Sequence, residues 1–209
     1  MQLKEEDRFI EILTGSYCVL DLAKITGNAE FIELDLGCGK GSFTTKLAER
    51  YPDRAVLAAD VMIGRLRKLV KRNQRLGVAN ITALRVEAQL LVSRFLPDNG
   101  LDRLHLLCPD PWPKERHRGH RLVTADFATQ LRRVLKLGGV LHFSSDDVPY
   151  RDSVERILDG CGLFERDDSA IADIADIKTD FEELWLSTGK DVRHYAYRAL
   201  PVNFDSPGH

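Results

Sequence analysis

Three glycines and an acidic residue form the first group in the chain whose types and spacing could do chemistry. Gly37, Gly39 and Gly41 follow an apolar run that contains Asp35. Because glycine has no Cβ and tolerates positive φ, such a turn can be tight and can let a ligand approach the backbone closely. Ser42 stands where a dinucleotide-binding fingerprint would have its third glycine, which disfavours NAD or FAD. The pattern indicates a cofactor site of the nucleotide type at the end of a strand.

The acid two positions before the first glycine resembles the first motif of class I methyltransferases, which use S-adenosylmethionine. By that likeness Gly37 and Gly39 contact the cofactor, and the carboxylate of Asp35 faces its ammonium end. The alternative is that the glycines form only a tight connection between a strand and a helix.

Acidic residues also end the next two predicted strands. Asp60 closes the run 55–60, at about the distance from Asp35 at which a nucleotide-binding unit places a carboxylate on the ribose hydroxyls. Its alternative role is that of a helix N-cap, where aspartate is favoured. Glu87 and Ala88 end the run 81–88. The methyltransferase resemblance implies that this acid receives the adenine amine, and the alternative is a surface glutamate at a strand end.

The loop after the run 101–107 holds a third candidate group. Prolines fix φ and restrict the residues before them, so Asp110 and Trp112 are expected on a stiff loop at the ligand-binding edge of the sheet. An aromatic and basic patch of this kind can stack a base and neutralise phosphate. Its alternative is a stiff surface loop with solvated charges. The basic side chains that follow are Lys114, Arg116, His117, Arg118, His120 and Arg121.

This loop resembles the signature of the bacterial tRNA (guanine-N7-)-methyltransferase family, and the likeness spans roughly residues 31 to 198. Two further segments agree with the family pattern: 145–150, with Asp146, and 179–182. The residues of the loop that match are Pro109, Asp110, Pro111, Trp112, Lys114, Arg116, His117 and Arg121.

The family resemblance implies a role for each matching residue. Asp110 is implied to be the catalytic residue and to line the cofactor together with Asp35, Asp60 and Glu87. Gly119, His120 and Asp180 stand where the family usually has basic residues, which predicts few phosphate contacts. The residues implied to contact the guanosine side are Lys114, Asp146, Thr179, Asp180, Phe181 and Glu182.

Strands that alternate with helices predict an α/β fold, with a doubly wound, mostly parallel sheet of seven strands and helices on both faces. A strand near Phe164 and the run 194–200 predict a closing antiparallel hairpin. We expect one methyltransferase domain over residues 1–209, with a helical lead-in over 1–30 and a frayed tail at 203–209. The predicted helix over 62–76 has a basic face that could meet phosphate or be solvated: Arg65, Arg67, Lys68, Lys71, Arg72 and Arg75.

Composition sets limits on the protein class. The net charge of -2 over 209 residues offers no global argument for nucleic-acid binding, so any such argument is local. The four cysteines lack metal-ligand spacing, and we expect no metal. Without a signal core or a long apolar run, the chain is expected to be cytoplasmic and not to bind membranes.

The resemblance predicts an enzyme that transfers the methyl group of S-adenosylmethionine to N7 of a guanosine in tRNA. Three alternatives stay open at this point. One is a methyltransferase acting on an exocyclic amine, because D-P-W resembles the D-P-P-Y loop of amino-methyltransferases. Another is a non-catalytic RNA-binding or scaffolding subunit with the same fold, and a more remote one is an NAD-dependent oxidoreductase. Both a monomer and a homodimer are compatible with the sequence.

Overall fold

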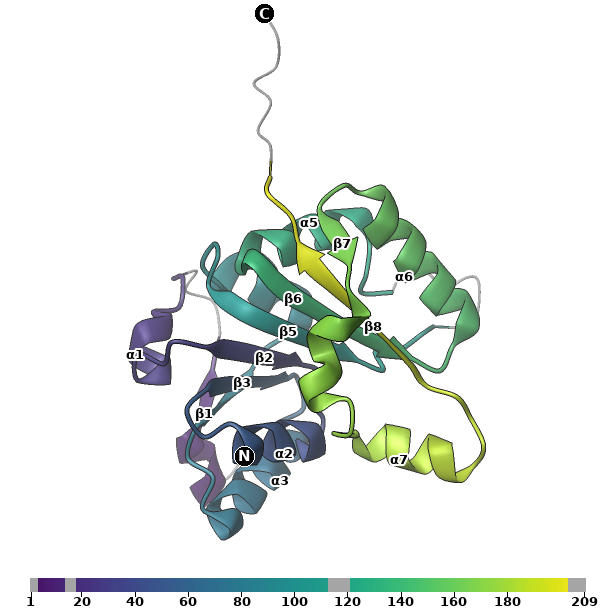
Figure 1. The fold of residues 1–209 in the computed structure, drawn as a ribbon. Helices are drawn as coiled ribbons and strands as arrows, with labels where there is room; N and C mark the ends of the chain where they lie inside the picture. Colours follow the sequence, from purple (N-terminus) through teal and green to yellow (C-terminus); the bar gives the residue numbers. More distant parts are fainter. Residues whose placement is uncertain (1–3, 14–17, 113–120, 203–209) are drawn as a thin grey trace, which may run out of the picture.

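The computed structural model describes residues 4–13, 18–112 and 121–202. The loop residues 113–120 and the tail 203–209 lie outside the described residues; the loop residues include Lys114, Arg116, His117, Arg118, Gly119 and His120. Eight strands of the described part form one sheet (Figure 1). In their order across the sheet they are β1 (Ile10–Ile12), β4 (Ile81–Arg85), β3 (Ala55–Asp60), β2 (Ile32–Leu36), β5 (Leu101–Leu107), β6 (Leu135–Ser145), β8 (Arg193–Ala199) and β7 (Phe164–Arg166).

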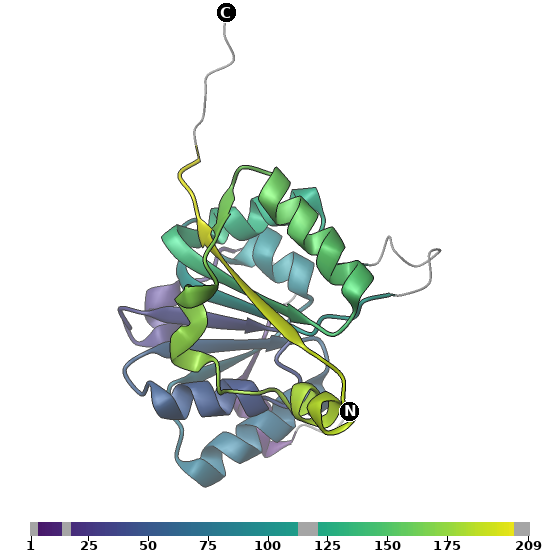
Figure 2. The same cartoon turned by 45° about the vertical axis from the view of Figure 1, so that its right-hand side comes forward.

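Helices cover both faces of the sheet (Figure 2). On one face lie α2 (Ser42–Arg50), α3 (Ile63–Leu76) and the 3-10 helix η4 (Asp168–Ile174). On the other lie α5 (Ala125–Val134), α6 (Val148–Gly160) and the π-helical turn η2 (Leu91–Phe95). The remaining elements are α1 (Leu22–Thr26), α4 (Ala88–Leu90), α7 (Asp180–Ser187) and the 3-10 helix η1 (Glu5–Phe9).

The apolar runs of the sequence become strands that are buried on both faces. Every residue of β2 and of β3 is buried. Leu34 and Leu57 pack with Phe127 of α5 on one face, whereas Val56 packs with Leu47 of α2 on the other. A strand with apolar neighbours on both faces needs no polar alternation, which is why β3 is apolar from Ala55 to Ala59. In β2 the apolar residues alternate with two buried acids, Glu33 and Asp35.

The strand order reverses between β2 and β5, which lie side by side although β3 follows β2 in the chain. Ligands of open α/β sheets bind in the crevice outside the carboxyl ends of the strands at such a switch point. The glycine turn follows β2 and the proline-rich loop follows β5. The topology therefore brings the two candidate segments to the same place.

The fold class is confirmed, with three differences in detail. The sheet has eight strands rather than seven, because residues 10–12 pair with β4 instead of continuing the expected N-terminal helix. Gly138 and Gly139, a glycine pair of the kind that is typical of turns, lie within β6 at a register shift against β5. β7 and β8 are antiparallel as expected, but η4 and α7 lie in their connection, so they do not form a tight hairpin.

Candidate functional site

The glycine turn is held against the neighbouring strand by its own backbone. The N–H groups of Gly37 and Cys38 donate to the carbonyl of Ala59, at 2.8 and 2.9 Å. Gly37, Gly39 and Gly41 have φ of 86°, 58° and 74°, the left-handed region that glycine adopts without a steric cost. A Cβ on Gly41 would lie 2.1 Å from Leu69 Cδ1, so glycine also lets α3 pack against the turn.

Asp35 is buried beside this turn. Its carboxylate accepts a hydrogen bond of 2.5 Å from the hydroxyl of Thr44. Burial raises the pKa of Asp35 to about 6, and the negative charge of Asp60 adds to the rise, against the lowering effects of Thr44 and His105. A buried carboxylate with a hydroxyl as its hydrogen-bond partner can accept a cationic ligand group, as the sequence predicted for this residue.

Asp60 joins the glycine turn to the start of α3. Its carboxylate accepts hydrogen bonds from the N–H of Gly39 at 3.1 Å and from the N–H of Met62 at 2.7 Å, and Arg65 lies 3.3 Å away. The N-cap of α3 is Met62, so Asp60 is not the helix cap that was its alternative role. These contacts fix the carboxylate at the edge of the turn, where the ribose role remains a prediction.

Glu87 is exposed, as its structural alternative expected, and it also caps a short helix. It lies beyond the end of β4 and is the N-cap of α4, whose first residue is Ala88. Its two carboxylate oxygens accept the N–H groups of Gln89 and Leu90, at 2.9 and 2.8 Å. Because the carboxylate is exposed and each oxygen has a further lone pair, the adenine role also remains a prediction.

The proline-rich loop has an unusual backbone around Asp110. Cys108 and Trp112 have φ of 49° and 43°, although both precede a proline, where extended backbone was expected. Non-glycine residues in this region cost of order 1–3 kcal/mol each and cluster at functional sites. The exposed Asp110 lies between them. At the other end of the loop, Arg121 donates to the carbonyl of Pro111 at 2.8 Å.

Helix α7 brings the second family segment to the glycine turn. Thr179 is its N-cap and accepts the N–H of Glu182 at 3.0 Å. The N–H of Asp180 donates to the hydroxyl of Ser42, the first residue of α2, at 2.9 Å. The structure therefore places the predicted guanosine-side residues of this helix beside the predicted cofactor turn, although 138 positions separate Asp180 from Ser42.

The remaining substrate-side residues differ in their surroundings. Phe181 is half exposed and its ring lies 5.8 Å from that of Trp185. Asp146 lies 3.4 Å from Lys190, whose ammonium also lies over the Trp185 ring. Glu182 is buried, so this one member of the segment faces the sheet.

A line of histidines that the sequence reasoning did not single out runs across the sheet to Glu182. Its members are Glu33 on β2, His105 on β5, His142 on β6, His194 on β8 and Glu182 on α7. The successive hydrogen bonds measure 2.9, 3.0, 2.8 and 2.9 Å. In the sequence, each of the three strands shows only a single histidine. The contact between the three rings becomes visible only from the order of the strands in the sheet.

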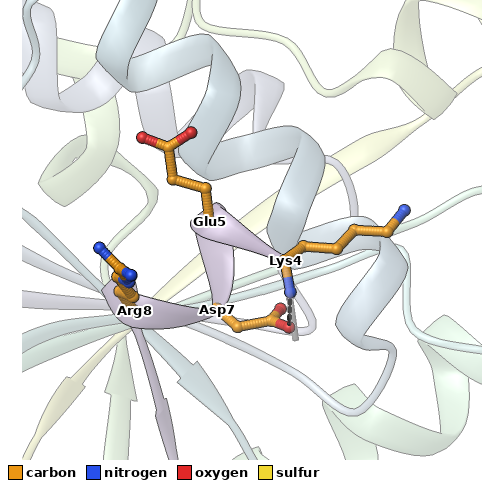
Figure 3. A pocket seen from close by; sticks show the side chains of 4 residues that line it. All are labelled: Lys4, Glu5, Asp7 and Arg8. Atoms are coloured by element: carbon orange, nitrogen blue, oxygen red, sulfur yellow. Dashed lines mark hydrogen bonds between the residues drawn. The ribbon is translucent and has the colours of Figure 1, made fainter. Parts of the chain in front are cut away.

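Acidic residues of η1 occupy part of the basic face of α3. Arg67 makes two hydrogen bonds of 2.7 Å with Asp7, and Lys71 lies 3.0 Å from Glu6. This face is therefore partly neutralised, which the absence of acids within the helix did not reveal. Figure 3 shows a surface pocket at η1 that is lined by none of the predicted site residues; its lining is Lys4, Glu5, Asp7 and Arg8.

In the part of the chain that the structure describes, no group of three or more His, Cys, Asp or Glu side chains has the geometry to hold a metal ion. None of the helices described is long and apolar enough to cross a membrane.

Comparisons with known proteins agree with this geometry. Residues 29–195 match the family described as "Putative methyltransferase". A tRNA (guanine-N(7)-)-methyltransferase of Neisseria meningitidis is 32% identical over 179 residues, which cover 81% of this chain and 73% of that protein. This chain belongs to the tRNA (guanine-N(7)-)-methyltransferase family. The resemblance of the loop and of the two further segments is thus confirmed at the level of the family.

Other members differ from this chain in length. The relative from Syntrophotalea carbinolica is 39% identical over 134 residues, which cover 64% of this chain and 58% of that protein. The chain thus spans little more than half the length of this relative. Among solved structures, the 16S rRNA methyltransferase KamB has a TM-score of 0.65 at 19% identity and covers 88% of this chain and 95% of its own. A likeness at that identity supports the fold.

Proposed function

We propose that the protein transfers the methyl group of S-adenosylmethionine to N7 of a guanosine in tRNA, in the cytoplasm. The observation that carries the proposal is the hydrogen bond between Asp180 and Ser42. It joins the segment that the family resemblance assigns to the guanosine side to the turn that it assigns to the cofactor side. Family membership supports the choice of reaction, and the substrate is inferred from it.

The residues of the turn fit the cofactor. Ideal Cβ positions on Gly37 and Gly39 meet no atom within 4 Å, so open space lies over both residues. The raised pKa of Asp35 indicates a carboxylate whose charge lacks compensation, as suits an ammonium group. When bound, S-adenosylmethionine supplies an electrophilic methyl group on a sulfonium.

The reaction requires the protein mainly to position the two reactants and to stabilise the charge that develops. Guanine N7 carries a lone pair and no proton, so its attack on the methyl carbon needs no general base. The N7–carbon bond forms as the carbon–sulfur bond breaks, and the positive charge passes to the purine. Asp110 orients the guanine through its polar edge and offsets this charge, while Trp112 shapes the pocket.

The test is to incubate the protein with bulk tRNA and methyl-labelled cofactor and to locate the label after digestion to nucleosides. The expected product is 7-methylguanosine. Label on an exocyclic amine would support the alternative reaction instead. No label, together with cofactor binding absent in calorimetry, would support a non-catalytic RNA-binding subunit.

Asp110 is tested with a matched pair of variants. Asp110→Ala should abolish turnover, because the charge that offsets the purine is lost, while the cofactor dissociation constant stays largely the same. Asp98→Ala removes an exposed carboxylate that pairs with Arg133 away from the loop, and serves as the control. Turnover retained in Asp110→Ala would remove this residue from the catalytic role.

The basic face of α3 offers a second matched pair. Lys68 is exposed, whereas its neighbour Arg67 is engaged with Asp7. If α3 meets phosphate, Lys68→Gln should reduce the salt dependence of tRNA affinity by about 0.7–0.9 in the log–log slope. Arg67→Gln should change it less. An unchanged slope in Lys68→Gln would make this face a solvated one.

A further inference from the structure

The five side chains from Glu33 to Glu182 form an unbroken line of hydrogen bonds across four neighbouring strands. Glu33 Oε2 pairs with His105 Nε2, and His105 Nδ1 pairs with His142 Nδ1. His142 Nε2 pairs with His194 Nδ1, and His194 Nε2 pairs with Glu182 Oε1. Every ring therefore uses both of its nitrogens. We call these five side chains the histidine chain.

The carboxylates at the two ends are ionised. Burial of Glu33 opposes its ionisation, yet hydrogen bonds from His105 and Arg54 and the charges of His105 and Arg103 lower its pKa. Burial likewise opposes ionisation of Glu182, and the hydrogen bonds from His194 and Lys178 lower its pKa. Because an ionised carboxylate only accepts hydrogen bonds, the Nε2 atoms of His105 and His194 must carry protons.

The protons of three neutral rings are too few for the chain. A neutral imidazole has one N–H, and those of His105 and His194 are used on the carboxylates. Neutral His142 can donate to one neighbour only. Its other nitrogen would then face a lone pair at 2.8 or 3.0 Å, which is repulsive. Four hydrogen bonds need four protons, so the geometry requires one more than three neutral rings supply.

We propose that the histidine chain carries this additional proton at neutral pH, and that His194 is thereby a positioning residue that fixes Glu182 and the first turn of α7 over the glycine turn. The role of α7 in substrate binding rests on the proposed function, whereas the proton count rests on the hydrogen-bond geometry and on the ionised carboxylates at the two ends of the chain.

The additional proton resides on one of the outer rings. Burial lowers the pKa of His142 well below its usual value, and the charges of the neighbouring rings add to this. The charge can pass from His105 to His194 without ring rotation. The His105 Nδ1–H bond breaks as the His142 Nδ1–H bond forms, and the His142 Nε2–H bond breaks as the His194 Nδ1–H bond forms. The other charged groups that face the chain are Asp35, Arg54, Arg103, Asp173 and Lys178.

Helix α7 depends on this link because it has little apolar contact with the sheet. Glu182 is its one buried residue. When the pH rises and the additional proton is lost, one inner hydrogen bond becomes a repulsive contact. The support under Glu182 then weakens, and the helix turn that carries Thr179 and Asp180 loses its fixed position.

The direct test is nitrogen-15 NMR of histidine-labelled protein at pH 7, with rings assigned through His105→Gln, His142→Leu and His194→Gln. The proposal predicts four nitrogen-bound protons summed over the three rings, and three at alkaline pH. It also predicts one proton on each remaining ring in His142→Leu, where no inner bond is left. Three protons at pH 7 in the wild type would overturn the proposal even if every variant failed to fold.

Kinetics test the positioning role separately. His194→Ala should raise the KM for tRNA about tenfold or more, as expected for one hydrogen bond to a charged group, with the cofactor dissociation constant unchanged. His194→Gln keeps a donor for Glu182 but no titratable ring. It should restore much of the KM and abolish the alkaline rise in KM of the wild type. A KM that is unaffected in both variants would overturn the positioning role. A wild type without tRNA activity would defeat the proposed function and leave the NMR test intact.

Discussion

The glycine turn and helix α7 meet at Ser42, yet different interactions hold them to the sheet. The turn is fixed by backbone hydrogen bonds to Ala59 and by the close packing of Gly41 on Leu69. Helix α7 is fixed by polar contacts of Asp180, Glu182 and Glu183, and buries no apolar side chain of its own.

This difference predicts that the glycine turn and helix α7 differ in mobility. Apolar contacts inside a packed core are lost only when the core opens, whereas exposed ion pairs contribute little and break readily. The cofactor side should therefore remain formed while α7 opens and closes. Under the proposed function, this arrangement would let a substrate as large as tRNA enter past α7 before the helix closes on it.

The largest effect is expected at Gly41. Gly41→Ala adds a Cβ at 2.1 Å from Leu69 in a residue with φ of 74°. Strain and overpacking together should lower the free energy of unfolding by about 2–5 kcal/mol in chemical denaturation. Gly77→Ala is the matched control, because its φ of 72° is similar and its Cβ would meet no atom within 4 Å. Equal losses in the two variants would refute the packing role.

Asp35 should give the turn a pH dependence of stability. Its pKa rises from the usual 3.8 to about 6 on folding, so the folded state binds the proton more tightly. Stability from this group is present below pH 4 and is lost as the pH rises through 6, by about 3 kcal/mol. Asp35→Asn cannot titrate, so the variant should be more stable than the wild type at pH 7 and similar to it near pH 4. A difference that does not change with pH would contradict the shift.

Asp60 should affect the cofactor more than the fold. Asp60→Ala should weaken the binding of S-adenosylmethionine by about 1.5–3 kcal/mol in calorimetry, the usual value of hydrogen bonds to a charged group. Glu87→Ala provides the comparison, since that carboxylate is exposed and caps α4, whereas Asp60 is buried beside the glycine turn. If Asp60→Ala leaves the dissociation constant unchanged, Asp60 serves only to hold Gly39 and Met62.

The smallest effect is expected on the α7 side. Lys46 and Glu183 form an exposed ion pair at 2.7 Å between α2 and α7. A double-mutant cycle with Lys46→Met and Glu183→Gln should give a coupling below about 1 kcal/mol in global stability. A much larger coupling would mean that α7 unfolds together with the core, which would contradict the expected independent opening of α7.

The strand, turn and helix around the three glycines could be predicted from the sequence because their signals are local. An apolar run, three glycines and an acid stand next to one another, and the strand, turn and helix followed from them. The short strand β1 gave no such signal, because three residues among charges show no period. A glycine pair is typical of a turn, but Gly139 lies in β6, where the backbone of Leu101 and Asp102 passes too close for a side chain.

The substrate side was less predictable because its contacts are distant in the chain. The family resemblance pointed to Glu182, but nothing near it in the sequence shows that its partner is His194. The histidine chain depends on the order of β2, β5, β6 and β8 and on the register that places His105 opposite His142. Such contacts follow from the fold and cannot be read from spacing.

Native-state hydrogen exchange tests the central comparison most directly. Amides of α7 should exchange by local opening, with rates that hardly respond to low concentrations of denaturant, whereas amides of α2 and β2 should exchange only through global unfolding. His194→Ala should speed exchange in α7 and leave α2 unchanged. If α7 and α2 show the same opening free energy and the same response to denaturant, the two sides of the site form one cooperative unit and the account is wrong.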